Sequence, residues 1–283
     1  KAFFGRNPER LAIKKKEWRL KEYTSITQMV YEKKLDIVLI ANENFNHAND
    51  AYIAIEAGAN VLVEKPIDAF IKPAEKLIKF SKKKEKILGV FLQKRFDSNI
   101  VKIKKILENN ELGEVSIVRV DIFMHRNKDY FNSRSWIQDP SKIGGGILLH
   151  HAIHSIDALL WVMDSNVISV SGWISNSAKS MEIEDSGGCW IRFDNGVTAS
   201  VMASVNLQES LRNRMEIFGE KSSLFLDGTS LKYKSNIDEE KKCRNNYATS
   251  YCNEHKLLWL DFIDAVRNDR SPHITGESAL RSQ

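Results

Sequence analysis

Residues 36–66 read DIVLIANENFNHANDAYIAIEAGANVLVEKP, and this stretch decides the fold class. Asp36–Ala41 and Val61–Val63 are short, nearly continuous apolar runs, as in strands that a sheet buries on both faces. Between them, His47–Ala57 repeats apolar residues at helical spacing and ends before Gly58, a common helix stop. A strand, a helix and a second strand in this order predict a βαβ unit and therefore a parallel sheet.

The alternation extends to both sides and then gives way to consecutive strands. The sequence predicts first-half strands and helices at Ala2–Phe4, Pro8–Trp18, Pro73–Lys84 and Ile87–Leu92. After about Gln93 it predicts helices and strands at Asn99–Glu108, Val115–His125, Gly146–Met163, Val167–Ser175, Gly188–Phe193, Val197–Val205, Arg214–Phe218 and Ser223–Leu226. Asn195-Gly196 indicates a hairpin. We therefore expect an α/β chain whose first domain, residues 1–94, has a parallel sheet. The second, residues 95–283, should be an α+β domain with a mostly antiparallel sheet.

The composition is that of an ordinary globular chain. Its 42 Lys and Arg residues and 37 Asp and Glu residues give a formal net charge of +5, with the excess mostly in Lys14–Lys16 and Lys72–Lys86. Few aromatic residues interrupt these stretches, which favours solvated helix surface over a nucleic-acid groove. We find no apolar run of the roughly 18 residues that span a bilayer. Cys189, Cys243 and Cys252 form no CxxC pair, so we expect free thiols in the cytoplasm.

Three segments are predicted to lie beyond the carboxyl ends of parallel strands, where such sheets bind ligands. They are Gly5–Asn7, Asn42–His47 and Glu64–Pro66. A tripeptide such as Glu64–Pro66 is most often a surface turn. Lys65, however, follows directly from a buried strand, and Pro66 biases it towards an extended conformation. We therefore expect the Lys65 ammonium at the ligand-binding edge of the sheet.

A second cluster begins at Gly144-Gly145-Gly146 and leads into a helix with three of the chain's seven histidines, His150, His151 and His154. A single helical histidine is usually structural. His150 and His154 are four residues apart and would share one helix face. That arrangement suits acid–base catalysis near neutral pH or a metal site. Because no glutamate follows His150 as in an HExxH motif, we favour acid–base chemistry and predict no metal.

Several of these segments resemble the motifs of one enzyme family. Glu56-Ala57-Gly58 followed by Val61–Pro66 resembles the EAGKHVLVEKP signature of the Gfo/Idh/MocA oxidoreductases. Asn44 and His47 resemble the end of the family's TPNxxH turn.

Two further resemblances lie beyond residue 92. Gly144–Gly146 with His154 and Asp157 resembles the family's GGGxLxDxGxHxxD helix. Gln93–Phe96 and Trp136 resemble members that act on nucleotide-linked sugars, such as UDP-N-acetylglucosaminuronate 3-dehydrogenases. The resemblance covers essentially the whole chain.

This resemblance implies a Rossmann domain at residues 1–94 that binds NAD or NADP, and a substrate-binding and oligomerisation domain at 95–283. The reaction would move a hydride to or from a hydroxyl-bearing carbon of a sugar, nucleotide sugar or polyol, in a homo-oligomer such as a dimer or tetramer. Lys65 would hold the reacting hydroxyl, and His154, converging on the same pocket, would exchange its proton. Other cofactor contacts implied are Arg6, Asn44, His47 and Glu64, and other substrate contacts are Arg95, Trp136 and His150.

The chain departs from the family pattern in several places. It begins at what resembles the second strand and stops before the usual last helix, so we expect the Gly-rich turn and first βα unit to be missing. Asn42-Glu43 replaces the family's Thr-Pro, and His150 replaces its helix aspartate. Gly5 replaces the acidic residue after the second strand, and Arg6 beside it matches phosphate oxygens, although it could also pack on adenine. We therefore expect a modest preference for NADP over NAD.

Two other functions remain open. The residues at Asn42-Glu43 and His150 fit a non-catalytic relative that binds a dinucleotide or sugar and acts as a sensor or partner protein. The three histidines fit a metal-dependent hydrolase or lyase, although no further ligand appears at a recognisable spacing. Reduction of NAD or NADP across a panel of sugars distinguishes the first alternative, and metal analysis the second.

Overall fold

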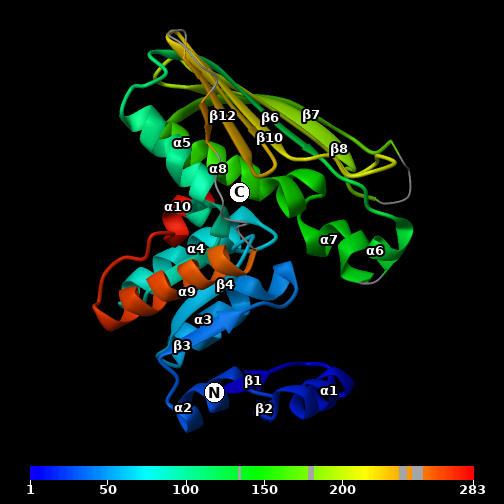
Figure 1. The fold of residues 1–283 in the computed structure, drawn as a ribbon. Helices are drawn as coiled ribbons and strands as arrows, with labels where there is room; N and C mark the ends of the chain where they lie inside the picture. The colour runs from blue at the N-terminus through cyan, green and yellow to red at the C-terminus, as the bar shows by residue number, and fades with distance from the viewer. Residues whose placement is uncertain (133–134, 178–181, 236–240, 244–250) are drawn as a thin grey trace. The chain divides into compact units, whose positions relative to one another are not determined.

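The structure is a computed structural model that describes residues 1–132, 135–177, 182–235, 241–243 and 251–283. The chain divides into two compact units, whose elements are labelled in Figure 1. Unit 1 comprises Lys1–Phe91 and Leu258–Leu280, and unit 2 comprises Leu92–Leu257 and Arg281–Gln283. Residues 258–280, assigned to the second domain by the sequence analysis, therefore pack with the first.

Unit 1 alternates short strands with helices, as predicted. Its elements are β1 (Ala2–Phe4), α1 (Pro8–Trp18), β2 (Lys21–Tyr23), α2 (Ile26–Lys33), β3 (Ile37–Ile40), η1 (Asn44–Asn46), α3 (His47–Glu56), β4 (Asn60–Glu64), α4 (Ile71–Lys83), β5 (Leu88–Phe91), the last part of α9 (Tyr251–Arg267) and α10 (Gly276–Leu280). The strands form two separate parallel sheets, β1–β2 and β3–β4–β5. This arrangement confirms the Rossmann-type parallel fold, with the sheet in two parts.

The strands and helices in the second half of unit 1 have clear apolar patterns in the sequence because their apolar residues form the core of the unit. Ala51 and Ala54 of α3 and Val61 of β4 are fully buried. On β5, a side chain at Gly89 would come within 2.6 Å of the Phe262 ring, so glycine is needed for α9 to approach the sheet. Phe262 is 1% exposed. Its close packing against Gly89 is one of the contacts that hold residues 258–280 in unit 1.

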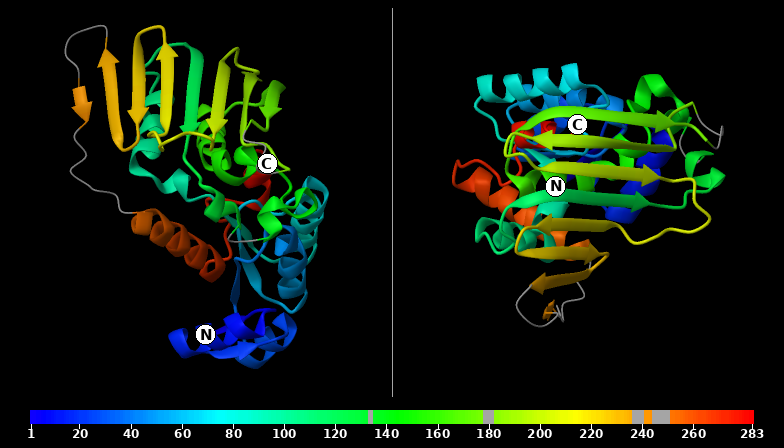
Figure 2. Two further views of the ribbon diagram at one scale, coloured as in Figure 1. Left: turned by 90° about the vertical axis from the view of Figure 1, so that its right-hand side faces the viewer. Right: turned by 90° about the horizontal axis from the view of Figure 1, so that it is seen from above.

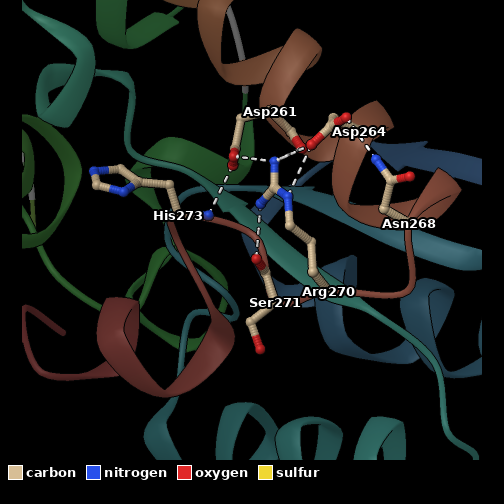
Figure 3. Close-up of polar contacts among 6 residues, drawn as sticks. All are labelled: Asp261, Asp264, Asn268, Arg270, Ser271 and His273. Atoms are coloured by element: carbon tan, nitrogen blue, oxygen red, sulfur yellow. Dashed lines mark hydrogen bonds and ion pairs between the residues drawn. The ribbon is translucent and has the colours of Figure 1, made fainter.

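The chain after α9 is tied to that helix by one arginine (Figure 3). The Arg270 guanidinium donates to Asp264 at 2.8 Å and to Asp261 at 2.8 Å. Asp261 also accepts the backbone N–H of His273 at 2.7 Å. The chain then reaches Thr275, which forms an antiparallel bridge with Gly89 of β5. These contacts lock the C-terminal segment onto the β3–β4–β5 sheet.

Unit 2 consists of a large sheet with helices, as predicted. Its elements are η2 (Gln93–Phe96), α5 (Ser98–Glu108), β6 (Val115–Phe123), α6 (Lys128–Asn132), η3 (Ser135–Gln138), α7 (Pro140–Ile143), η4 (Leu148–Ala152), α8 (Ile153–Met163), β7 (Val167–Ser175), β8 (Ser186–Phe193), β9 (Thr198–Ser204), β10 (Arg214–Gly219), β11 (Ser222–Asp227), β12 (Ser230–Ser235), β13 (Lys241–Cys243) and the first part of α9. The strand order is β13-β12-β11-β10-β6-β9-β8-β7. Among the strands that the structure describes in this sheet, only β6 and β9 pair in parallel, so the sheet is mostly antiparallel.

One face of this sheet carries the core of unit 2. Alternate residues of the strands, such as Val118, Val120 and Val201, are at most 1% exposed and pack with Ile103 of α5 and Leu159 of α8. Figure 2 shows the opposite face in its right-hand view, with these helices behind the sheet. The predicted α+β domain with a mostly antiparallel sheet is therefore confirmed for the described part of the chain, and the sheet carries these helices on one face.

The stretch Pro140–Met163 corrects one expectation. It has 24 residues, and its most apolar 18-residue window has a mean hydropathy of 1.3, which is long and apolar enough to span a membrane by length and composition, whereas we predicted no such run. In the structure 56% of its best 18-residue window is buried. A side chain at Gly146 would lie 2.0 Å from the Glu184 carbonyl oxygen. The backbone at Gly146 is therefore in close contact with the residues that precede β8. Packing in the core of unit 2 accounts for its hydropathy.

Candidate active site

Lys65 lies where the sequence analysis placed it, directly after β4. The three preceding apolar residues, Val61–Val63, are at most 1% exposed. Burial lowers the pKa of the Lys65 ammonium to about 8, while the neighbouring Glu64 carboxylate acts to raise it. The Lys65–Pro66 peptide bond is cis. A lysine with a pKa this close to neutrality can hold or release a proton under ordinary conditions, as catalytic lysines do.

His47 is buried behind this turn. The residue is 1% exposed. Its Nδ1 lies 2.7 Å from the Pro66 carbonyl oxygen, and its Nε2 lies 3.2 Å from the Asn42 carbonyl oxygen. The side chain therefore links the chain after β3 to the chain after β4. This geometry favours a positioning role for His47, so that any cofactor contact would come through the backbone that it holds.

The corner after β1 contains a network that the sequence did not predict. The Arg6 guanidinium donates a short hydrogen bond to the Asp50 carboxylate, and Asn42 Nδ2 donates to the same carboxylate at 2.6 Å. Asp50, in α3, is 2% exposed. In the sequence, Asp50 was visible only as the acidic residue in the first turn of that helix. The network ties Arg6, after β1, to Asn42, after β3.

A cavity of about 440 Å³ opens at the same corner. Its lining includes Phe4, Arg6, Arg10, Asn42 and Asn46. The α1 helix begins here and is capped by Asn7, whose side chain accepts the Arg10 backbone N–H at 2.9 Å. Guanidinium groups and a helix N-terminus attract anions such as phosphates.

These residues fit the adenosine side of a dinucleotide. The cavity offers cationic donors and aromatic surface at the carboxyl edge of parallel strands. Nearby, Asn44 is 4% exposed, and its Nδ2 has no hydrogen-bond partner among the residues that the structure describes. A buried donor of this kind is costly unless a ligand or water accepts its hydrogen bond. Asn44 therefore fits the cofactor contact that the sequence analysis predicted for it.

In unit 2 the predicted histidines lie on two kinds of helix. His150 and His151 lie in η4, a π-helical turn, and His154 lies in α8. The expected α-helical spacing of four does not apply across η4, because a π-turn holds more residues than an α-turn. This corrects the single helix predicted for Gly146–Met163. Such π-turns often occur at functional sites.

Aromatic side chains surround two of these histidines. The Trp136 ring lies 6.1 Å from the His150 ring, centroid to centroid, and the Tyr130 hydroxyl lies 3.4 Å from His151 Nε2. The His150 and His151 rings are 4.9 Å apart in an edge-to-face contact. Trp136 and His150 were both predicted to contact substrate, and the structure brings them together. Tyr130 and His151 were not predicted to join them.

His154 lines a separate small cavity of about 50 Å³. Lys94 and Asp97 line the same cavity and form an ion pair at 3.2 Å. Asp97 also affects Glu254 of α9, whose pKa is raised to about 7, mainly by burial. The sequence analysis quoted Lys94 only within the Gln93–Phe96 motif and did not single out Asp97 or Glu254, which lie more than 150 residues apart along the chain.

Arg95 has a different environment from the one predicted. Its guanidinium is 5% exposed and forms a two-pronged ion pair with Asp157, Nε at 2.8 Å and Nη2 at 2.6 Å. The pair fastens η2 to α8, the helix that carries His154. This geometry favours a structural role for Arg95, which would act on a substrate through the position of α8.

The alternative of a metal site concerns His150, His151 and His154. Among the residues that the structure describes, no group of three or more His, Cys, Asp or Glu side chains could hold a metal ion. Cys189 is a free thiol, and the side chains of Cys243 and Cys252 lie outside the described part. The metal-dependent alternative therefore has no support in this part of the structure.

A parallel βαβ unit with a half-buried lysine at a strand end, and an α+β unit with a histidine-bearing helix, are the features expected of an oxidoreductase of the dinucleotide-binding class. Comparison with family models agrees. Residues 1–92 match the model described as oxidoreductase family, NAD-binding Rossmann fold, and residues 100–225 match the GFO/IDH/MocA C-terminal domain. The chain belongs to the GFO/IDH/MocA oxidoreductase family.

Individual relatives are distant. The chain is 23% identical over 268 residues to myo-inositol 2-dehydrogenase of Thermotoga maritima, a match that covers 91% of this chain and 77% of that protein. It shares its fold with the WlbA dehydrogenase of Bordetella pertussis in complex with NADH and UDP-GlcNAcA, at 23% identity, a TM-score of 0.88 and coverage of 99% and 84%. A levoglucosan dehydrogenase in complex with NADH and levoglucosan gives 20% identity, a TM-score of 0.90 and coverage of 100% and 84%.

Proposed function

We propose that the protein is an NAD(P)-dependent dehydrogenase that acts on a secondary hydroxyl of a sugar, nucleotide sugar or polyol. The observation that carries this proposal is the half-buried Lys65 after β4, whose pKa is lowered to about 8 by removal of its ammonium from water. The named relatives act on compounds of this kind, an inositol, a nucleotide-linked sugar and an anhydrosugar. Unit 1 would bind the dinucleotide, and unit 2 the substrate.

Two side chains would carry the proton chemistry. Lys65 would donate a hydrogen bond to the reacting hydroxyl and stabilise negative charge as it develops on that oxygen. His154 would take the hydroxyl proton, since an imidazole can accept a proton near neutral pH. Trp136 and His150 would hold the sugar, an aromatic ring against its apolar face and an imidazole against its hydroxyls. That Lys65 and His154 act on one hydroxyl stays a prediction.

The cofactor would be held mainly by unit 1. The bound nicotinamide supplies the hydride acceptor or donor. Arg6 would contact the adenosine ribose or its 2′-phosphate, and Asn44 would donate its buried amide hydrogens. Glu64 and Lys65 would lie at the nicotinamide end, positioned with the help of His47. We retain the modest preference for NADP that Arg6 suggests, with NAD as the alternative.

Steady-state kinetics test the proposal. NAD and NADP reduction would be followed across a panel of inositols, anhydrosugars and nucleotide sugars, with wild type, Lys65→Ala and His154→Ala. We expect turnover with at least one substrate and a loss of about 10²–10⁴-fold in each variant. The matched control is Lys79→Ala, an exposed lysine of α4. Dinucleotide binding without turnover on any substrate would instead support the non-catalytic alternative.

A further inference from the structure

We propose that Asp50 of α3 is a specificity-determining residue that weakens the preference for NADP over NAD. The inference rests on the proposed function, because it concerns how the same corner discriminates between two dinucleotides. NADP differs from NAD by a phosphate on the adenosine ribose, so the discrimination depends on the charges near that phosphate.

The first step is the position of the Asp50 carboxylate. Its Oδ1 accepts the short hydrogen bond from Arg6 and also lies 3.5 Å from Asn49 Nδ2, while its Oδ2 accepts from Asn42 at 2.6 Å. The Asp50 side chain is 3% exposed, whereas that of Arg6 is 46% exposed. These contacts therefore hold the Asp50 carboxylate away from solvent, whereas the Arg6 side chain is partly exposed and lines the cavity.

The second step is the net charge that a ligand meets. Arg6, Arg10 and Lys14 line the cavity with positive charge, but Lys14 is paired with Glu17 at 2.6 Å. Asp50 likewise offsets the charge of Arg6. A 2′-phosphate bound by Arg6 would lie within about two hydrogen-bond lengths of a buried carboxylate, where charges are poorly screened. NAD has no phosphate there and avoids this repulsion.

The third step is that an asparagine in place of Asp50 would carry no charge and could still make the same contacts. Asparagine has the same shape and still offers a carbonyl oxygen to Arg6. Its amide would meet Asn42, whose Oδ1 is buried without a hydrogen-bond partner among the described residues. Rotation of the Asn42 amide would turn that oxygen towards the new donor. Asp50→Asn therefore removes one negative charge and preserves the network.

The experiment measures dissociation constants for NADP and NAD by protein fluorescence in wild type, Asp50→Asn, Arg6→Ala and the double variant. We expect Asp50→Asn to shift the ratio of the two constants about tenfold towards NADP, the order of magnitude for a full charge at this range. In the Arg6→Ala background the same substitution should change the ratio much less. Asp50→Ser, which also removes the charge, should shift it in the same direction if Asp50→Asn folds poorly.

Glu43→Gln is the matched control, because Glu43 lines the same cavity and carries the same charge without an ion pair to Arg6. We expect it to change the ratio less than about threefold. A ratio unchanged in both Asp50 variants, or an equal change in Glu43→Gln, would overturn the role of Asp50 while leaving dinucleotide binding in place. Failure of wild type to bind either dinucleotide would overturn the proposed function and this inference with it.

Discussion

The half-buried Lys65 sets stability against function at the scale of one residue. Lys65 has a pKa of about 8 in the folded protein, mainly because burial disfavours its charge, whereas an unfolded lysine has a pKa of about 10.4. Between these values the unfolded chain binds more protons, so this group makes stability rise with pH in that window. Below about pH 8 the cost of its buried charge is fully present.

We therefore predict that Lys65→Met stabilises the protein while it abolishes activity. Its melting temperature should exceed that of wild type by a few degrees at pH 7, and the difference should shrink between about pH 8 and 10.4. Differential scanning calorimetry across this range measures the effect. Lys79→Met, which changes an exposed lysine, should show no such trend. If the difference in melting temperature between Lys65→Met and wild type were the same at every pH, burial would not disfavour the charged form of Lys65.

Single residues also show where prediction from sequence ends. Lys65 and Arg6 could be placed because each follows a strand, and strand ends define a ligand-binding edge. Asp50 could not be connected to Arg6, since 44 residues separate them and nothing local marks the pair. The burial of Arg95 was equally hidden, because its partner Asp157 is 62 residues away. Local patterns predict position in an element, whereas pairing across elements depends on the packed fold.

At the scale of elements, the Arg95–Asp157 pair joins η2 to α8. Both side chains are at most 5% exposed, and the two hydrogen bonds are 2.8 and 2.6 Å long. Removing Arg95 leaves the buried Asp157 carboxylate with only the Ser282 hydrogen bond and the charge of Arg281 to stabilise it. We predict that Arg95→Ala lowers the free energy of unfolding by about 3–5 kcal/mol. Urea denaturation measures this change.

The double variant Arg95→Met/Asp157→Leu provides the control. It removes both charges and fills similar volume, so it should be clearly more stable than Arg95→Ala. If Arg95 instead served only to bind substrate, Arg95→Ala would raise KM and leave the unfolding free energy near the wild-type value.

Elements with strong periodicity were predicted well, and short or charged ones were missed. The predicted helix Asn99–Glu108 differs by one residue from α5, which buries Ile100, Ile103 and Ile106. The predicted strand Val167–Ser175 and helix Pro8–Trp18 have the same bounds as β7 and α1, although neither element has a buried residue. The strand β2 is only three residues long and includes two charged side chains, so it shows no apolar pattern. The π-turn η4 could not be predicted, because the same residues also fit a regular helix. Hydrophobic spacing therefore explains the prediction of α5, whereas α1 was predicted from a different local signal, the proline at its first position.

At the scale of the whole molecule, the outer face of the large sheet is unusually apolar. Trp173 of β7, Trp190 of β8, Met202 of β9 and Ile117 of β6 are 38–56% exposed. Strand registers place the first three on one face, since Trp173 and Met202 both pair with Gly188, two residues before Trp190. Exposed apolar patches of this extent usually mark protein–protein contacts.

We predict that this face joins copies of the chain into a homo-oligomer, which the sequence analysis also expected. Light scattering at micromolar concentration should give a mass of two or more chains for wild type. Trp190→Asp places a charge in the centre of the patch, where pairing across an interface would bury it at a high cost, so this variant should be a monomer. Tyr31→Asp, which changes an exposed aromatic residue of α2 in unit 1, should leave the mass unchanged. A monomeric wild type would show that the apolar face serves another purpose.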